Sequence, residues 1–179
     1  MHTRRIHAEG FLRDDGQWDI EARIVDTKTY RYEEPFRGER GAGEPVHDMA
    51  VRLTIDSDMT VRAIEVDMPA TPYPACATVR PAFQDLVGAR IGSGWRKAVT
   101  EAVGREKGCT HVRELLFPMA TVAFQTLGGW REKKDTAKPP LPGAPEQRPY
   151  FIGGCKAWAE SGEVVAKLYP KWHRPATKA

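Results

Sequence analysis

Residues 46–68 read VHDMAVRLTIDSDMTVRAIEVDM, and they predict the hairpin around which the rest of the chain is organised. The first half alternates in the manner of a strand with one buried face, with the apolar positions Met49, Val51, Leu53 and Ile55. Asp56-Ser57-Asp58 is typical of a turn. The second half, Val61–Met68, has an apolar pattern that shifts register, which indicates a β-bulge or a strand buried on both faces.

Two earlier strands are predicted upstream of this hairpin, at Arg4–Arg13 and Trp18–Tyr30. The second has the clearer pattern, because apolar and charged side chains alternate from Trp18 to Ile24. Asp14-Asp15-Gly16 joins the two strands as a turn, and residues 33–45 (EEPFRGERGAGEP) form a polar, glycine-rich loop.

Three helical segments follow the hairpin, after Pro69, Pro72 and Pro74 have ended the sheet. They are Ala75–Val87, which Pro81 weakens, Gly94–Val103 with Ser93 as its cap, and Thr110–Leu127, which Gly128-Gly129 stops. Pro118 would kink the last of them. The expected fold class is α+β: a small antiparallel sheet with helices packed on one face.

The chain divides by composition into three parts. Residues 1–130 are expected to form a single α+β domain. Residues 131–149 (REKKDTAKPPLPGAPEQRP) predict a linker of charges and prolines. Residues 150–179 form a C-terminal segment, with a β-hairpin turning at Ser161-Gly162, that packs back on the domain or on a partner subunit.

The bulk composition excludes several classes of protein. The formal net charge of +3 comes from scattered basic residues, which does not indicate nucleic-acid binding. No signal peptide and no membrane span are found, so we expect a cytoplasmic protein that does not contact membranes. The three cysteines do not suggest a disulfide framework.

The most informative chemical groups lie at Gly108–Glu114 (GCTHVRE), where the longest helix is expected to begin. Thr110 is the predicted cap, and the helix dipole would favour a Cys109 thiolate and a neutral His111. Glu114 follows His111 on the same side of the helix. For each residue a structural role, as a buried thiol or a surface His–Glu pair, is the alternative.

Two upstream segments could converge on this helix start. His47-Asp48 opens a strand, and because adjacent strand residues point to opposite faces, one of the two faces the helices; His47 is preferred over Asp48. Cys76 follows the proline-rich turn at Pro72–Pro74, and Cys155 is expected to be structural. Each of these residues could also serve packing or strand-end hydrogen bonding alone.

Several of these segments together resemble a bacterial family known only as a domain of unknown function, number 2889. The resemblance covers nearly the whole chain. It rests on Asp15-Gly16, Trp18–Ala22, Asp26–Lys28, Pro45–Met49, Pro72–Cys76, Leu86–Gly88, Gly108–Leu116 and Tyr169–Trp172. It implies an association with the catabolism of lignin-derived aromatic compounds. A thioesterase acting on an aromatic acyl-coenzyme A would fit that setting.

A more distant likeness is to iron–sulfur scaffolds of the NifU/IscU type, which share the order of hairpin, ligand loop, cysteine and cysteine at a helix start. Here those places hold His47-Asp48, then Cys76, then Cys109. The likeness implies a NifU/IscU-like fold. The departure is that the first ligand loop of a scaffold supplies a cysteine, whereas this chain has Val46-His47.

The leading hypothesis for function is hydrolysis of an aromatic acyl-coenzyme A, such as vanilloyl- or hydroxybenzoyl-coenzyme A, without a cofactor. His47 or Asp48 would activate water, the helix start would bind the oxyanion, and His111 and Glu114 would assist, with Cys109 as a covalent nucleophile in a variant. The basic residues available for the coenzyme's phosphates are Arg80, Arg90, Arg96 and Lys97.

Two alternatives stay open. One is a metal or iron–sulfur protein that uses Cys76, Cys109, His111 and His47 as ligands. The other is a non-catalytic protein whose tryptophan-bearing tail forms an interface. Whether the chain forms a homo-oligomer is also open at this point.

Overall fold

The computed structural model describes residues 1–134, 148, 149 and 151–176, and for residues 131–134 it describes the backbone alone. The chain divides into two compact units, Met1–Gly129 and Trp130–Ala179. The first unit has an α+β fold, with a small antiparallel sheet and a few helices, as the sequence predicts.

Four antiparallel strands form the main sheet, in the order β1-β2-β5-β6. Their bounds are β1 His2–Leu12, β2 Trp18–Lys28, β5 Pro45–Ile55 and β6 Val61–Ala70. The alternation in β2 places Ile20, Ala22 and Ile24 on the buried face, where none is more than 3% exposed. Because the side-chain period of a strand is two, the charged residues between them fall on the opposite, open face.

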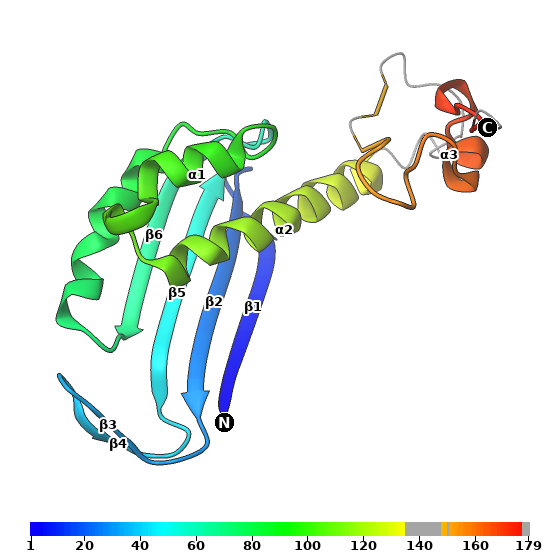
Figure 1. Ribbon diagram of the computed structural model, residues 1–179. Helices are drawn as coiled ribbons and strands as arrows, with labels where there is room; N and C mark the ends of the chain where they lie inside the picture. Colours follow the sequence, from blue (N-terminus) through cyan, green and yellow to red (C-terminus); the bar gives the residue numbers. More distant parts are fainter. Residues whose placement is uncertain (135–147, 150, 177–179) are drawn as a thin grey trace. The chain divides into compact units, whose positions relative to one another are not determined.

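Three helical elements cover the buried face of this sheet: the 3-10 helix η1 Pro74–Leu86, α1 Trp95–Val103 and α2 Thr110–Lys134. In Figure 1, α1 and α2 both lie across the same face of the strands. Trp95 on α1 donates its ring N–H to the carbonyl of Leu116 on α2 at 2.9 Å. Their apolar side chains complete the core, including Phe83, Leu86, Val99, Leu115, Leu116, Met119 and Ala123, each wholly buried.

Bulges occur where the sequence pattern shifts. Between β5 and β6 the register slips at Thr54/Ile55, opposite Arg62, which is the bulge that the offset apolar pattern indicates. The same pair of strands slips again between Asp48 and Ala50. A third irregularity in β2–β5 pairing lies between Asp26 and Thr27, opposite Pro45 and His47. The start of β5 around His47 therefore has an irregular pairing with both neighbouring strands.

Four predicted details are wrong. The loop at 33–45 contains a short hairpin, β3 Tyr32–Glu34 and β4 Gly38–Arg40. Ala75–Val87 is 3-10 rather than α-helical, with Pro81 inside it. Ser93 does not cap α1, whose N-cap is Gly94. The C-terminal hairpin is replaced by the helix α3 Glu163–Leu168, of which Gly162 is the N-cap.

The predicted end of the long helix is also wrong, because α2 continues through Gly128-Gly129 to Lys134. Residues 131–134 of the predicted linker are therefore helical, and residues 135–147 of it lie outside the described residues. The short 3-10 turn η3 Pro170–Trp172 follows α3. No helix among the described residues is long and apolar enough to cross a membrane.

Candidate functional site

Asp26 is the centre of a cluster of charged and polar side chains inside the sheet–helix interface. It continues the inward alternation of β2 one step beyond Ile24, so a carboxylate occupies a position where the pattern would place an apolar residue. Its side chain is wholly buried. On the neighbouring strand, its paired residue is His47.

The Asp26 carboxylate is held by a guanidinium from the edge strand. Arg4 on β1, opposite Asp26 in the register, donates from Nε to Oδ1 at 2.8 Å and from Nη2 to Oδ2 at 2.7 Å. Two parallel bonds of this kind fix the plane of the carboxylate as well as its charge. His2 Nε2 lies 3.4 Å from Oδ1.

Burial alone would raise the pKa of Asp26. The hydrogen bonds and charge of Arg4, together with the hydrogen bond from His47, outweigh burial and lower the pKa to about 2. Asp26 is therefore ionised throughout the physiological range. Because an ionised carboxylate can only accept hydrogen bonds, His47 Nδ1, 3.0 Å from Oδ2, carries the hydrogen of that contact.

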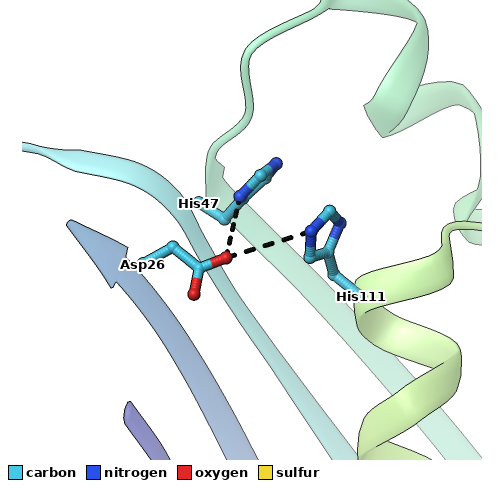
Figure 2. Close-up of side chains that lie close together, drawn as sticks. All are labelled: Asp26, His47 and His111. Atoms are coloured by element: carbon cyan, nitrogen blue, oxygen red, sulfur yellow. Dashed lines mark hydrogen bonds and ion pairs between the residues drawn. The ribbon is translucent and has the colours of Figure 1, made fainter. Parts of the chain in front are cut away.

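His47 and His111 face each other beside this carboxylate (Figure 2). Their ring centroids are 3.8 Å apart with planes inclined by 30°. His111 Nε2 lies 3.9 Å from Oδ2 of Asp26. Burial lowers the pKa of both imidazoles, and for His111 the nearby His47 and Arg4 lower it further. Both rings are therefore neutral at pH 7.

The start of α2 positions His111. The helix begins at Thr110, and the carbonyl of Cys109 accepts the hydrogen bond from the N–H of Arg113. Cys109 is thus the N-cap residue, in place of the predicted Thr110. Its Sγ lies 3.8 Å from His111 Nδ1 and 3.8 Å from Met49 Sδ.

These contacts place His111 between a thiol and a carboxylate. One ring nitrogen faces Cys109 Sγ and the other faces Asp26 Oδ2, at 3.8 and 3.9 Å. His47 has the shorter contact with the same carboxylate. The site therefore contains two histidines that share one buried anion.

Two of the predicted site residues lie outside this cluster. Asp48 points to the other face of the sheet, where Arg23 pairs with it through two hydrogen bonds of 2.7 and 2.6 Å. Glu114 is exposed and accepts a hydrogen bond from Arg113 at 3.3 Å. His47, Cys109 and His111 are the predicted residues that the structure brings together.

The predicted metal ligands are not assembled as a set. Cys76 lies in η1, partly buried, and among the described residues it belongs to no group of three or more close ligand atoms. Among the described residues, the group that could hold a metal is Asp26, His47 and His111, whose ligand atoms all lie within 4.8 Å of one another. Cys155 in the second unit is exposed.

The four basic residues predicted to meet phosphates lie on the helices and the loop between them. Arg80 and Arg90 donate to the backbone carbonyls of Ala77 and Asp58. Arg96 lies over the ring of Phe117, 4.5 Å from its centroid, and Lys97 lies 3.8 Å from Glu101. None of them contacts the Asp26 cluster.

An exposed aromatic pair lies near the end of β5 that carries His47. Phe36, in the turn between β3 and β4, packs edge-on against Tyr73 with ring centroids 5.7 Å apart, and both rings are more than half exposed. The turn is joined to β5 because Arg37 donates to the carbonyl of Pro45 at 3.0 Å and pairs with Glu34. Tyr73 follows β6, whose Ala70 pairs with Asp48.

Asp26 and Arg4 were missed by sequence reasoning, although a signal for Asp26 exists. A carboxylate at an inward position of a strongly alternating strand must be paired, because an isolated buried charge is costly. That rule applied to Trp18–Lys28 singles out Asp26. It does not identify Arg4, since β1 carries two adjacent arginines and only the register decides between them.

Comparison with known proteins identified one match. The family described as "Protein of unknown function (DUF2889)" matches residues 2–125, the part of the chain that carries every residue of this cluster. No curated protein and no solved structure matches the chain significantly.

Proposed function

This chain belongs to the DUF2889 family, whose function is unknown, and we propose that the protein is a thioesterase that hydrolyses an aromatic acyl-coenzyme A. The proposal rests on the geometry of the site. The observation that carries the proposal is the hydrogen bond between Asp26 Oδ2 and His47 Nδ1, at 3.0 Å, with the carboxylate buried and ionised. A carboxylate that orients a neutral imidazole in this way is the arrangement of a general base.

In this mechanism His47 acts through Nε2. With Nδ1–H directed to Asp26, Nε2 bears a lone pair and takes a proton from water as the oxygen bonds to the acyl carbon. The carbon–sulfur bond then breaks, and the proton on His47 passes to the coenzyme sulfur. The products are the aromatic acid and free coenzyme A, and Asp26 stabilises the transient imidazolium without taking its proton.

The start of α2 would stabilise the charge on the carbonyl oxygen. The first N–H groups of an α-helix have no partner within the helix and lie at the positive end of its dipole. The side chain of His111, a residue of this first turn, brings its ring centroid to 3.8 Å from that of His47, so the helix start lies beside the proposed base. No cofactor is needed for this chemistry.

Cys109 offers a covalent variant. His111 would accept the thiol proton and the thiolate would attack the acyl carbon. The carbon–sulfur bond to coenzyme A would then break, with the proton on His111 passing to the leaving sulfur, and water would hydrolyse the Cys109 thioester to release the acid and restore the thiol. The contact of 3.8 Å between Cys109 Sγ and His111 Nδ1 supports His111 as the group that takes the proton from the Cys109 thiol. The shorter Asp26–His47 contact favours direct attack by water.

The aromatic acyl group is the part of the proposal that depends on the surroundings. Phe36 and Tyr73 expose their rings near the His47 end of β5, where a planar acyl group could stack on them. Vanilloyl- and hydroxybenzoyl-coenzyme A are the substrates proposed, with a role in the breakdown of lignin-derived aromatic compounds in the cytoplasm. A membrane or a nucleic acid is not among the partners proposed.

The test is release of free thiol from a panel of coenzyme A thioesters: vanilloyl, hydroxybenzoyl, benzoyl and acetyl. Protein freed of metal by chelator should turn over the aromatic members in preference to the acetyl ester. Absence of turnover for every member would overturn the proposal. Turnover retained by Cys109→Ser would remove the covalent variant and leave hydrolysis by water.

A metal-binding protein is the second candidate, favoured by the closeness of ligand atoms in Asp26, His47 and His111. Two features oppose it. A metal lies close to the ring plane of a ligating histidine, about 2 Å from the nitrogen, whereas these two rings are stacked with planes only 30° apart. Arg4 also occupies both oxygens of Asp26 and would repel a cation.

The likeness to NifU/IscU-type scaffolds belongs with this second candidate and stays a prediction. Elemental analysis of protein purified without added metal, together with its absorption spectrum, tests it. Bound zinc, iron or an iron–sulfur chromophore at about one equivalent per chain would favour the metal site over the hydrolase.

A further inference from the structure

The outer edge of β1 is a long unpaired strand edge. Met1 O accepts from the N–H of Thr29, and Arg13 N–H donates to Gln17 O, so the odd-numbered residues direct their backbone groups toward β2. Alternate residues of a strand direct these groups to opposite sides. The even residues from His2 to Leu12 therefore present their N–H and C=O groups outward, and within the first unit no described segment pairs with them.

The opposite edge of the sheet is treated differently. On β6, the carbonyl of Ile64 accepts from the Gln84 side chain, and Val61 exchanges backbone hydrogen bonds with Ala89 and Gly88. Proteins commonly cover or blunt strand edges because an open edge is a template for pairing. Only one edge of this sheet is covered in that way by the described residues of the first unit.

The sequence of β1 is complementary to itself when read antiparallel about His7. In that register the numbers of two facing residues add up to 14, so that His2 faces the partner's Leu12 and His7 faces its own copy. All eleven residues of the strand are then paired. Arg5 then faces the partner's Glu9, and Glu9 faces the partner's Arg5. The even residues form the hydrogen-bonded pairs, which the outward direction of their backbone groups requires.

The charges of Arg5 and Glu9 are free to make these contacts. Both side chains are exposed on the open face, and Arg5 has no ion pair among the described residues, while Glu9 has only His7 at 3.4 Å. Glu9 also lies opposite Glu21 on β2, which carries the same charge. Arg5 of a second copy would offset the repulsion between these two glutamates. A register moved by two residues loses the Arg5–Glu9 match and shortens the paired segment.

Apolar side chains on the other face fit the same register. Ile6 is 48% exposed and would face the partner's Ala8, so that the two copies bring four apolar side chains together. Leu12, 43% exposed, would lie across from the partner's His2. Non-hydrogen-bonded pairs such as Arg5–Glu9 are the closer ones in an antiparallel ladder, which favours an ion pair there.

We infer that the partner of this edge is a second copy of the same chain, joined through β1–β1 pairing about His7 into a continuous eight-stranded sheet. A two-fold axis makes such an interface isologous, so every favourable contact occurs twice. The inference does not rest on the proposed function, because its readout is molecular mass rather than activity.

The test compares the full-length chain with Arg5→Glu and Glu9→Arg by sedimentation or light scattering across a dilution series. The wild type should dimerise. Each single reversal places like charges opposite one another at two sites and should raise the dimer Kd by about tenfold or more. An equimolar mixture of the two variants should dimerise like the wild type, since the heterodimer restores both ion pairs.

Matched reversals on α1 serve as controls: Lys97→Glu and Glu101→Lys alter an exposed pair away from β1 and should leave the Kd unchanged. Far-UV circular dichroism establishes that each variant is folded. The double variant Arg5→Glu/Glu9→Arg should dimerise again and provides a second test. A monomeric wild type, or single reversals without effect on Kd, or a mixture that associates no better than its components, would each overturn the inference.

Discussion

Asp26 supplies the fixed negative charge of the candidate site. Its carboxylate is wholly buried, yet Arg4 and His47 keep its pKa at about 2, so the site retains a negative charge at any physiological pH. This fixed anion, beside two neutral imidazoles, orients one of them directly and lies within 4 Å of the other.

Replacing His47 should remove most of the proposed activity. His47→Gln keeps a polar side chain of similar size but has no basic nitrogen, so thioester kcat/KM should fall by about 10²–10⁴. Asp48→Asn is the matched control, because Asp48 lies on the opposite face and pairs with Arg23; its kcat/KM should stay within a few fold. Equal losses in the two variants would contradict His47 as the base.

The acid limb of the pH profile should report His47. The base works only when neutral, and burial lowers the pKa of His47 below the usual 6.5 of an imidazole. We therefore expect kcat/KM to be halved at a pH below 6.5 and to fall further toward acid. Measuring kcat/KM for an aromatic thioester against pH tests this, with protein stability checked at each pH. A midpoint above 7 would mean that another group is the base.

Asp26 should also stabilise the fold in a pH-dependent way. Because its pKa is lowered from 3.8 to about 2 in the folded state, ionisation contributes about 2 kcal/mol that is present above about pH 4 and lost as pH falls through 2. The free energy of unfolding of Asp26→Asn, measured with denaturant, should therefore approach that of the wild type near pH 2. A difference between the two that is constant with pH would contradict the assignment.

Sequence reasoning reached three of the residues that meet in this cluster and missed two. His47 was preferred over Asp48 from strand alternation, and Cys109 and His111 follow from the predicted helix start. Asp26 and Arg4 could not be recognised as a pair without the β1–β2 register, since the two are 22 residues apart. The catalytic roles of His47, Cys109 and His111 stay predictions.

Among the elements, β1 and α2 approach closely at one glycine. A Cβ on Gly10 would overlap Oγ1 of Thr126 and lie 3.0 Å from its Cβ, so the Thr126 side chain or the helix that carries it would have to shift. Gly10→Ala should lower the free energy of unfolding by about 1–3 kcal/mol through overpacking. Denaturant unfolding measures this loss.

The same contact can be tested by a double-mutant cycle. Thr126→Ala removes the two nearest atoms, so Gly10→Ala should cost clearly less in that background than in the wild type. Additive effects of the two substitutions would show that the helix and strand do not meet at this point.

Strand alternation predicted the elements of the main sheet well, because a buried face demands a strict period of two. The errors came where local propensity competes with packing. Two glycines were expected to end α2, but glycine costs only about 1 kcal/mol in a helix, and the helix continues through Gly128-Gly129 to Lys134. Pro81, similarly, changes the type of helix at Pro74–Leu86 and does not abolish it.

On the scale of the whole molecule, the first unit contains the entire cluster and its own core. A fragment of residues 1–134, which ends with α2, should therefore fold cooperatively and keep the helices and strands that the first unit has in the full chain. Circular dichroism and thermal unfolding of the fragment test this. A fragment that is unfolded, while the full chain is folded, would show that the second unit is needed for stability.

The position of Arg4 has a consequence for how this protein should be assayed. Its side chain holds Asp26, while its backbone N–H and C=O lie on the open edge of β1. Pairing at that edge would restrain the strand from which the guanidinium extends. Specific activity should then rise with enzyme concentration and level off, so an assay run at high dilution would underestimate turnover.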